Sequence, residues 1–259
     1  MSVRIHPTAL VDPGARLGVD VSVGPGSIVG PDVTLGDRTR IDAHALVTGW
    51  TTLGAGNHVH HGAVLGSPPQ DLKYSGRPSY LVIGDRNVFR ECCTINRGTT
   101  HGEGVTRLGS DGLYMAYTHV AHDCTVGDKV VLSNCATMGG HVEIGDWVQL
   151  GGLSAIHQFC KIGAHAFIGG GAIVTRDVPP YVMIAGNPAE PHSVNAEGLK
   201  RRGFGPQQIR NIRNAYRILY RSELTLATAV EQLTALAREQ PELATFVEFI
   251  GRSTRSLVR

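Results

Sequence analysis

The stretch TMGGHVEIGDWVQLGGLSAIHQFCKIGAHAFIGG, residues 137–170, places an apolar side chain at every sixth position, and its histidines avoid those positions. The same period links Ile5 to Leu65 without a break, and it returns from Ile83 to Ile95 and from Leu108 to Val174. An α-helix turns by roughly 100° per residue, so it cannot keep every sixth residue on one face. The period therefore excludes a helix for most of the chain.

Short strands joined by tight turns do fit the period. Three six-residue units make one triangular coil, and successive coils stack about 4.8 Å apart through parallel hydrogen bonds. Small residues recur four places after the periodic residue: Ala9, Ala15, Val21, Ser27, Cys93, Cys124, Ala136, Cys160 and Ala166. These residues suit the inside of a narrow prism, so three of the five cysteines are explained as packing. Glycine often follows the periodic residue and is expected at the corners.

The period is interrupted near residues 66–82 and 96–107, and it has ended by Pro188. Beyond that point apolar residues follow helical spacing, with helix starts predicted at Pro206, near Leu226 and near Pro241. We therefore expect an all-β solenoid, a parallel β-helix of hexapeptide repeats, over residues 1–187 with two inserted loops. A small α-helical C-terminal domain is expected over residues 188–259.

Composition excludes several classes of protein. The chain has 24 basic and 22 acidic side chains, and a net charge of +2 gives no indication of nucleic-acid binding. No apolar run approaches the roughly 20 residues that span a bilayer, and the N-terminus lacks the apolar stretch of a signal peptide. The five cysteines show no C-x-x-C spacing, which argues against a zinc or disulfide framework. We expect a cytoplasmic protein without a membrane span.

The histidines fall in a distinctive register. None of the twelve occupies a periodic position or a small inward position, so we expect them to face solvent or a partner subunit. Counted in coils of eighteen residues, His122, His141 and His157 lie on one vertical stripe across three consecutive coils. His119 lies near the same corner. A stripe of this kind indicates a site.

The column of His122 also holds Gly140 and Gln158, 18 and 36 residues later, which leaves space and an exposed backbone N–H beside the imidazole. A histidine with an ordinary pKa of about 6.5 suits a general base at neutral pH. Asp123 either raises the basicity of His122 or serves only the turn, where aspartate is common. The N–H of Gly140 is the candidate donor to an oxyanion.

Two other interpretations compete with an acyl-transfer site. One is a passive scaffold, because regular repetition alone does not require chemistry. The other is a zinc enzyme of the γ-class carbonic anhydrase type, which shares this kind of solenoid. Zinc ligands must lie about 2.1 Å from one metal ion, whereas the first and third coils of the stripe are about 9.6 Å apart. The H-x-x-x-x-H pair of that class is also missing, since His119 and His122 read H-x-x-H.

The first interruption and the C-terminal region carry charge. The segment PPQDLKYSGRP, residues 68–78, offers Asp71 and Lys73 beside Tyr74 and either contacts a polar, anionic ligand or forms a solvated loop. Arginines gather before and along the first predicted helix: Arg201, Arg202, Arg210, Arg213, Arg217 and Arg221. This basic surface could hold a phosphate or an acidic protein, or it is a solvated face.

Seven motifs occur in order along the chain: PQDLKY, NRGT, HVAHDCTVG, GGHVEIG, HQFCKIGAHAFIGG, DVPPYV and NAEGLKRRGF. With them the chain resembles, over its whole length, the UDP-N-acetylglucosamine acyltransferases, hexapeptide-repeat enzymes that begin lipid A synthesis in Gram-negative bacteria. The resemblance implies a left-handed coil and a homotrimer with active sites between subunits. It further implies transfer of a 3-hydroxyacyl chain from acyl carrier protein to the sugar 3-position of UDP-N-acetylglucosamine, without a metal or another cofactor.

The resemblance also assigns residues. It implies that His122 is the general base with Asp123 behind it and that the backbone of Gly140 binds the oxyanion. It implies substrate contacts for Asp71, Lys73, His119, His141, His157, Gln158, Asn195, Glu197, Arg201 and Arg202. Gly170 matches the position where a bulkier residue shortens the acyl pocket, so a long chain such as hydroxymyristoyl is expected.

Two related kinds of acyltransferase are alternatives to the expected transfer to the sugar 3-hydroxyl. The N-acyltransferase of the same pathway carries a uridine-binding domain before its solenoid, whereas the period here starts at Ile5, which disfavours that enzyme. Some relatives accept an amino group in place of the sugar 3-hydroxyl. The choice between an ester and an amide product therefore stays open at the level of sequence.

Overall fold

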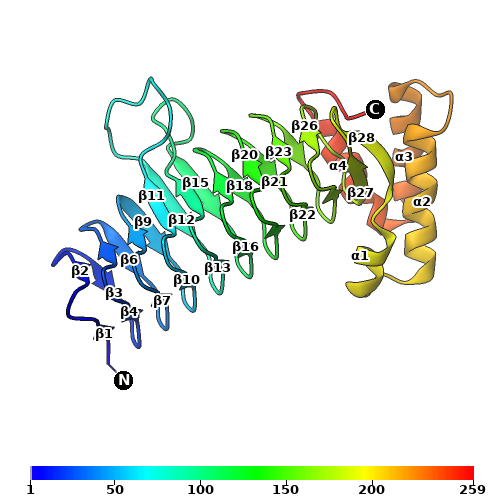
Figure 1. Ribbon diagram of the computed structural model, residues 1–259. Helices are drawn as coiled ribbons and strands as arrows, with labels where there is room; N and C mark the ends of the chain where they lie inside the picture. The colour runs from blue at the N-terminus through cyan, green and yellow to red at the C-terminus, as the bar shows by residue number, and fades with distance from the viewer. Residues whose placement is uncertain (1) are drawn as a thin grey trace.

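The computed structural model describes residues 2–259 and consists of a long three-sided prism with helices at its C-terminal end (Figure 1). Three sheets of eleven, nine and eight strands, which we call sheets A, B and C, form its sides, and each complete coil contributes one short strand to each sheet. Neighbouring strands pair in parallel, except that the last two strands of sheet A pair antiparallel. The chain visits the sheets in the order A, B, C, so each coil has corners AB, BC and CA. The expected solenoid followed by a helical region is confirmed.

The strands have the following bounds. Sheet A holds β1 (Arg4–Ile5), β4 (Ser22–Val23), β7 (Arg40–Ile41), β10 (His58–Val59), β13 (Val88–Phe89), β16 (Leu113–Tyr114), β19 (Val131–Leu132), β22 (Gln149–Leu150), β25 (Phe167–Ile168), β27 (Val182–Ala185) and β28 (Glu190–Val194). Sheet B holds β2 (Leu10–Val11), β5 (Ile28–Val29), β8 (Leu46–Val47), β11 (Val64–Ser67), β14 (Thr94–Asn96), β17 (His119–Val120), β20 (Thr137–Met138), β23 (Ala155–Ile156) and β26 (Ile173–Val174). Sheet C holds β3 (Arg16–Leu17), β6 (Val33–Leu35), β9 (Trp50–Leu53), β12 (Tyr80–Ile83), β15 (Val105–Leu108), β18 (Thr125–Val126), β21 (Glu143–Ile144) and β24 (Lys161–Ile162).

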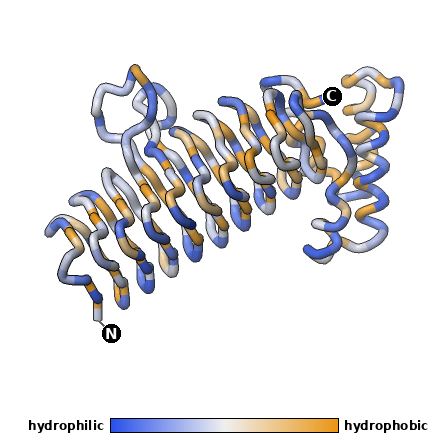
Figure 2. The backbone as a smooth tube through the Cα atoms, in the orientation of Figure 1, coloured by the Kyte–Doolittle hydropathy of each residue, from blue (hydrophilic) through white to orange (hydrophobic). Residues whose placement is uncertain are grey.

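The six-residue period fills the inside of the prism. Val120 pairs with Met138 and Met138 with Ile156 in adjacent strands, and all three side chains are buried. Apolar and polar residues accordingly alternate along every coil (Figure 2). The first coil is the exception, because within residues 2–259 no further coil packs against its outer side. There the periodic residue Ile5 is 46% exposed.

The small residues four places after the periodic ones also point inward, as predicted. Cys93, Cys124, Ala136, Cys160 and Ala166 are each fully buried. All five cysteines are free thiols. The packing explanation of Cys93, Cys124 and Cys160 is therefore confirmed.

The corners are built differently from the expectation based on glycine. The left-handed residue of a corner stands three places after the periodic residue and is usually not glycine, as at Asp123, His141 and Phe159 with φ of 57°, 60° and 66°. The glycine directly after the periodic residue instead permits close approach of the coils. A Cβ at Gly127 would lie 2.8 Å from the backbone N of Asp146. The corner side chains are thus free to vary.

Both interruptions project as loops at the BC corner, after β11 and after β14 (Figure 1). The first loop comprises residues 68–79 and the second residues 97–104. Arg97, which is buried, donates to the carbonyl of Gly66 at 2.6 Å and to the hydroxyl of Tyr74 at 3.2 Å. The side chain of His101 lies 3.0 Å from the carbonyl of Lys73. The second loop therefore holds the first in place.

The C-terminal region contains α1 (Ala196–Arg201), α2 (Pro206–Tyr220), α3 (Leu226–Ala237), a 3₁₀ turn (Pro241–Leu243) and α4 (Ala244–Arg252). The three predicted helix starts are confirmed, whereas α1 was not expected as a helix. The last strand of sheet A ends at Val194 and the first helix begins at Ala196, a few residues beyond the predicted domain boundary at residue 188. The division into two domains stays a prediction. None of the helices formed by residues 2–259 is both long and apolar enough to cross a bilayer.

The end of the chain returns to the prism. Buried Asp177 accepts hydrogen bonds from the hydroxyl of Ser253 and from the backbone N–H groups of Thr254 and Arg255, at 2.7–3.2 Å. Its other oxygen accepts from the N–H of Lys161 at 2.8 Å. This carboxylate fixes the tail to the last coils of the solenoid.

Candidate active site

His122 and Asp123 form a hydrogen-bonded pair at the BC corner, directly after β17. Nδ1 of His122 lies 2.9 Å from Oδ2 of Asp123. Adjacent residues can pair in this way because Asp123 adopts a left-handed backbone, with φ of 57°. The aspartate thus serves both the turn and the histidine. Because a carboxylate only accepts, Nδ1 donates and the lone pair of Nε2 is left for chemistry.

The Asp123 carboxylate is buried and well supplied with donors. The backbone N–H of Thr99 lies 3.0 Å from both of its oxygens, and the Thr99 hydroxyl donates to Oδ2 at 2.7 Å. Burial raises the pKa of Asp123, but the hydrogen bonds from His122 and Thr99 outweigh it and hold the pKa below its ordinary value. The group is therefore ionised at neutral pH. Thr99 lies in the second loop, which the sequence left unassigned.

His141 stands one coil above His122 and completes the polar group. The two rings meet edge to face with centroids 5.2 Å apart, and Nε2 of His141 lies 3.8 Å from Oδ2 of Asp123. Phe159 stacks on the other face of His141 at 4.6 Å. Gly102 of the second loop packs directly against His141, because a Cβ atom added at Gly102 would lie 2.7 Å from Cε1 of that histidine. Phe159 and Gly102 were not predicted as site residues.

The backbone of Gly140 lies against the His122 ring, as the register predicted. A Cβ at Gly140 would lie 2.5 Å from Cε1 and 2.8 Å from Nε2 of His122. Across residues 2–259, the backbone hydrogen bonds include none donated by the N–H of Gly140. The His122 ring therefore lies against a backbone segment whose N–H at Gly140 has no acceptor among the described residues.

The same corner carries three more of the predicted residues. Nδ1 of His119 is hydrogen-bonded to the hydroxyl of Thr94 at 2.7 Å, and burial, together with His122, lowers the pKa of His119. His157 and Gln158 are exposed after β23. The carbonyl of Gln158 accepts from Arg255 of the C-terminal tail at 2.7 Å. The predicted stripe thus lies along one corner of three consecutive coils, and its role as a site stays a prediction.

Asp71 and Lys73 lie in the first loop, also at the BC corner. Asp71 Oδ1 accepts from the N–H of Lys73 at 2.9 Å, which shapes the loop. The Lys73 side chain is exposed. Neither side chain forms an ion pair within the described chain, residues 2–259. Both remain available to an incoming ligand.

The other predicted residues lie elsewhere on the prism. Gly170 follows β25 and so lies at the AB corner, above Gly152. Asn195 caps α1 by accepting from the N–H of Gly198 at 3.2 Å and donates to the carbonyl of His165 at 2.9 Å, which ties it to the CA corner. Within one chain, the predicted residues are therefore divided among three corners.

Arg202 belongs to the CA corner as well. Its guanidinium lies 3.1 Å from Nδ1 of His165 and 5.2 Å from the centre of the Trp147 ring, and burial lowers its pKa. Burial, with Arg202 beside it, lowers the pKa of His165 to about 4, so the imidazole is neutral and accepts from the guanidinium. Glu197 and Arg201 are exposed on α1. Arg202 is thus held in one orientation.

Metal ligation is a second chemistry that this group of side chains permits. One donor atom each of His122, Asp123 and His141 lies within 4.8 Å of the others. However, Oδ2 of Asp123 already accepts from His122 and from the Thr99 hydroxyl, at 2.9 and 2.7 Å. The geometry fits a proton-transfer pair beside an oxyanion donor.

The chain is similar over its full length to known enzymes. It is 52% identical over 260 residues to the acyl-[acyl-carrier-protein]–UDP-N-acetylglucosamine O-acyltransferase of Burkholderia lata, with 99% of each chain covered. The corresponding protein of Thiobacillus denitrificans is 49% identical, with 98% of this chain and 99% of that one covered. The chain belongs to the UDP-N-acetylglucosamine O-acyltransferase family.

Solved structures of this acyltransferase family have the same fold. The enzyme of Moraxella catarrhalis superimposes with a TM-score of 0.96 at 41% identity, covering 98% of this chain and 99% of that chain. The Francisella novicida enzyme gives 0.97 at 38% identity, with coverages of 98% and 94%. Residues 177–258 also match the family model described as domain 2 of UDP-N-acetylglucosamine O-acyltransferase. The family resemblance and the fold class are confirmed, and the scaffold interpretation gives way to an acyltransferase.

Proposed function

We propose that this acyltransferase moves a 3-hydroxyacyl chain from acyl carrier protein to the 3-hydroxyl of UDP-N-acetylglucosamine, the first step of lipid A synthesis, in the cytoplasm. The relatives named above carry this donor and this acceptor in their names. The observation that carries the proposal is the placement of the free edge of the His122 ring against the backbone of Gly140. A base and an oxyanion donor are the two groups that attack on a thioester requires.

In the proposed reaction, Nε2 of His122 takes the proton of the sugar 3-hydroxyl while that oxygen attacks the thioester carbonyl carbon. The carbonyl becomes an oxyanion, which the N–H of Gly140 stabilises. The intermediate then collapses, the carbon–sulfur bond breaks, and the proton on His122 passes to the departing thiolate of acyl carrier protein. The products are the ester and the free thiol.

Asp123 supports this sequence without taking the proton. Its carboxylate fixes the tautomer of His122 and stabilises the imidazolium that forms during attack. The low pKa of Asp123, maintained by His122 and Thr99 against the effect of burial, keeps the carboxylate charged throughout. His141 and Phe159 form the wall of the same site above His122 and face the substrate.

The division of the predicted residues among corners supports a site that is shared between subunits. His122, His157 and Lys73 lie at the BC corner, whereas Gly170 lies at AB and Arg202 at CA. Residues on different corners of one prism cannot surround one substrate. We infer that neighbouring copies in a homotrimer bring these corners together, so that each substrate contacts two chains.

Turnover of purified protein tests the proposal. The wild-type enzyme and the His122→Ala variant are each treated with a metal chelator. Each protein is then incubated separately with UDP-N-acetylglucosamine and 3-hydroxyacyl-acyl carrier proteins of several chain lengths. We expect product from the wild type alone, while the variant keeps the wild-type circular dichroism. Product only with a 3-amino sugar acceptor would assign an amide-forming enzyme. Wild-type activity that disappears on chelation would favour a metal-dependent reaction.

A further inference from the structure

A second group of histidines lies outside the proposed active site, on sheet A among the N-terminal coils. His58 and His60 flank buried Val59 at the end of β10, and since strand side chains alternate, both rings stand on the outer face. The two rings stack with centroids 3.9 Å apart. The pairing of β10 with β7 places Ile41 opposite Val59, and hence Asp42 opposite His60.

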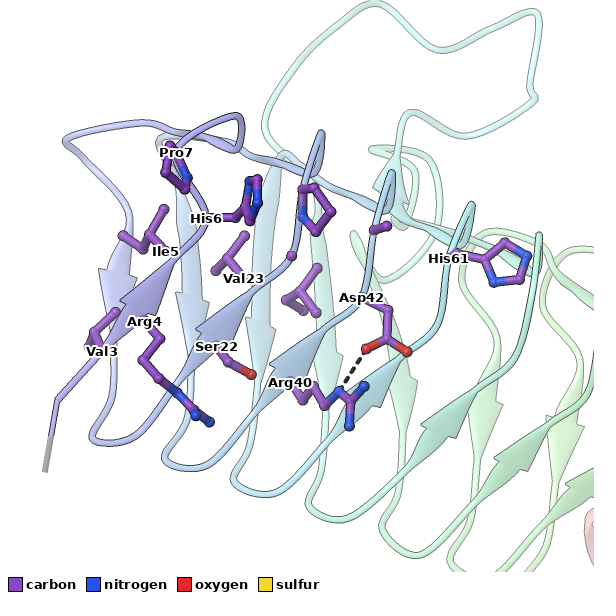
Figure 3. A pocket seen from close by; sticks show the side chains of 14 residues that line it. Val3, Arg4, Ile5, His6, Pro7, Ser22, Val23, Arg40, Asp42 and His61 are labelled. Carbon is purple, nitrogen blue, oxygen red and sulfur yellow. Dashed lines mark hydrogen bonds and ion pairs between the residues drawn. The ribbon is translucent and has the colours of Figure 1, made fainter.

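One carboxylate oxygen serves both rings. Oδ2 of Asp42 lies 2.8 Å from Nε2 of His58 and 3.4 Å from Nδ1 of His60. The other oxygen, Oδ1, accepts from Nε of Arg40 at 2.7 Å. Figure 3 shows this Arg40–Asp42 pair at the edge of a shallow groove over the first coils. Arg40 thus holds the carboxylate and leaves Oδ2 turned toward the histidines.

The donor atoms lie close enough together for one ion to contact all three after small shifts of the side chains. In a tetrahedral zinc site, bonds of about 2.1 Å set the donor atoms roughly 3.4 Å apart. The donor atoms of His58, His60 and Asp42 lie within 4.8 Å of one another. Glu91 stands beside them, with Oε1 at 3.8 Å from Nδ1 of His60, while Arg90 holds its carboxylate. All four side chains are about a quarter exposed, so an ion can reach them from solvent.

We propose that His58, His60 and Asp42 bind a divalent transition-metal ion, with zinc as the reference case, on the outer face of sheet A. Two imidazoles and one carboxylate select zinc, cobalt, nickel or copper over magnesium and calcium, which prefer oxygen ligands. Asp42 and the histidines belong to adjacent coils. A bound ion therefore links the two coils and stabilises the folded state.

Zinc titration of the purified, full-length protein tests this site. After dialysis against a chelator, wild type and the double variant His58→Gln, His60→Gln are titrated with zinc chloride by calorimetry. The group at His122 offers a second set of donor atoms, so the readout is the difference between the two proteins. We expect the double variant to bind one zinc ion fewer per chain. His61→Gln is the matched control, since His61 adjoins the group in the chain but supplies no ligand, and it should bind as wild type.

Two further measurements keep the test decisive. Without zinc, the double variant should melt like the wild type; with zinc, only the wild type and His61→Gln should gain thermal stability. If the double variant fails to fold, the single variants His60→Gln and Asp42→Asn replace it. Separately, titration of the wild type with cobalt should give the visible absorption of a tetrahedrally coordinated cobalt ion. Equal zinc stoichiometry in wild type and variants would overturn the proposal. The outcome does not depend on acyl transfer.

Discussion

The backbone of Gly140 touches the imidazole of His122 although the two residues are separated by a complete coil. Their contact is so close that a methyl group at Gly140 would lie 2.5 Å from Cε1 of the ring. The alignment is a property of the stacked coils, since the N–H of His141 donates to the carbonyl of His122 at 3.0 Å. The scaffold itself therefore sets the distance between the proposed base and the proposed oxyanion donor.

Replacing Gly140 by alanine should abolish most of the activity while keeping the fold. The added methyl displaces the His122 ring and the oxyanion from the N–H, and loss of such a donor costs on the order of 10²–10³ in kcat. Overpacking should lower the free energy of unfolding by about 1–3 kcal/mol. Steady-state turnover and thermal melting measure the two effects. Gly251→Ala, in open space on α4, is the control and should retain full activity.

The change Asp123→Asn should reduce kcat with little effect on KM. An amide can donate to Nδ1 of His122 and so favours the wrong tautomer, and it no longer stabilises the imidazolium; a loss on the order of 10²–10⁴ is expected. Asp128→Asn, at the next corner of the same coil, should leave turnover unchanged. A variant that loses activity only through a higher KM would contradict the proposed role of Asp123.

Mixed oligomers should recover activity that neither parent variant has. The variant His122→Ala lacks the proposed base at the BC corner, and the variant Arg202→Ala lacks a predicted substrate contact at the CA corner. If neighbouring chains share a site, each mixed trimer retains one intact site of three, roughly a third of wild-type turnover. Co-expression with two different affinity tags isolates the mixed species. Mixed trimers as inactive as the parents would show that both residues act from one chain.

Gly170→Met should shift the preferred acyl chain toward shorter donors. Gly170 is exposed, and a Cβ there meets only the backbone of Gly152 at 3.3 Å or more, so the side chain extends outward from the AB corner. Each methylene excluded from the pocket forfeits about 0.8 kcal/mol, so four of them lower kcat/KM for a long chain by on the order of 10². A panel of acyl carrier proteins with different chains measures the ratio. An unchanged ratio would place the end of the acyl pocket elsewhere.

Acid should destabilise the wild type more than His165→Gln. Burial, with Arg202 adjacent, lowers the pKa of His165 to about 4 in the folded state, against about 6.5 in the unfolded chain. Between these values the unfolded chain binds more protons, so stability falls as the pH decreases through this window and levels off below it. Urea unfolding at pH 7.5, 5.5 and 4.5 compares the proteins. Parallel pH profiles would refute the coupling.

The regular part of the molecule could be predicted from sequence because one rule repeats. A periodic residue such as Met138 faces inward in every coil, and eighteen residues return the chain to the same corner. The repeat of eighteen residues alone predicts that His122, Gly140 and His141 lie together at one corner. The same rule explained the buried cysteines, since Cys124 stands at the narrow inward position.

The contacts made by the inserted loops, the C-terminal helices and the corner residues could not be predicted from the six-residue period. Thr99 supports Asp123 from a loop that interrupts the period, so no register connects the two residues. The side chain of Asn195 caps α1 and donates to the carbonyl of His165, two structural contacts that no repeat pattern indicates, while its substrate contact stays a prediction. The left-handed corners carry residues such as Phe159, which no turn rule based on glycine would select.

The two ends of the prism differ in a way that bears on aggregation. At the C-terminal end, β28 and the helices cover the last coils. At the N-terminal end, β1, β2 and β3 present open strand edges, with Ile5 and Leu10 at 46% and 66% exposure. An edge of this kind invites end-to-end polymerisation. These strands are only two residues long, and Pro7 and Pro13 stand two places after the ends of β1 and β2, so an incoming chain finds few backbone groups to pair with.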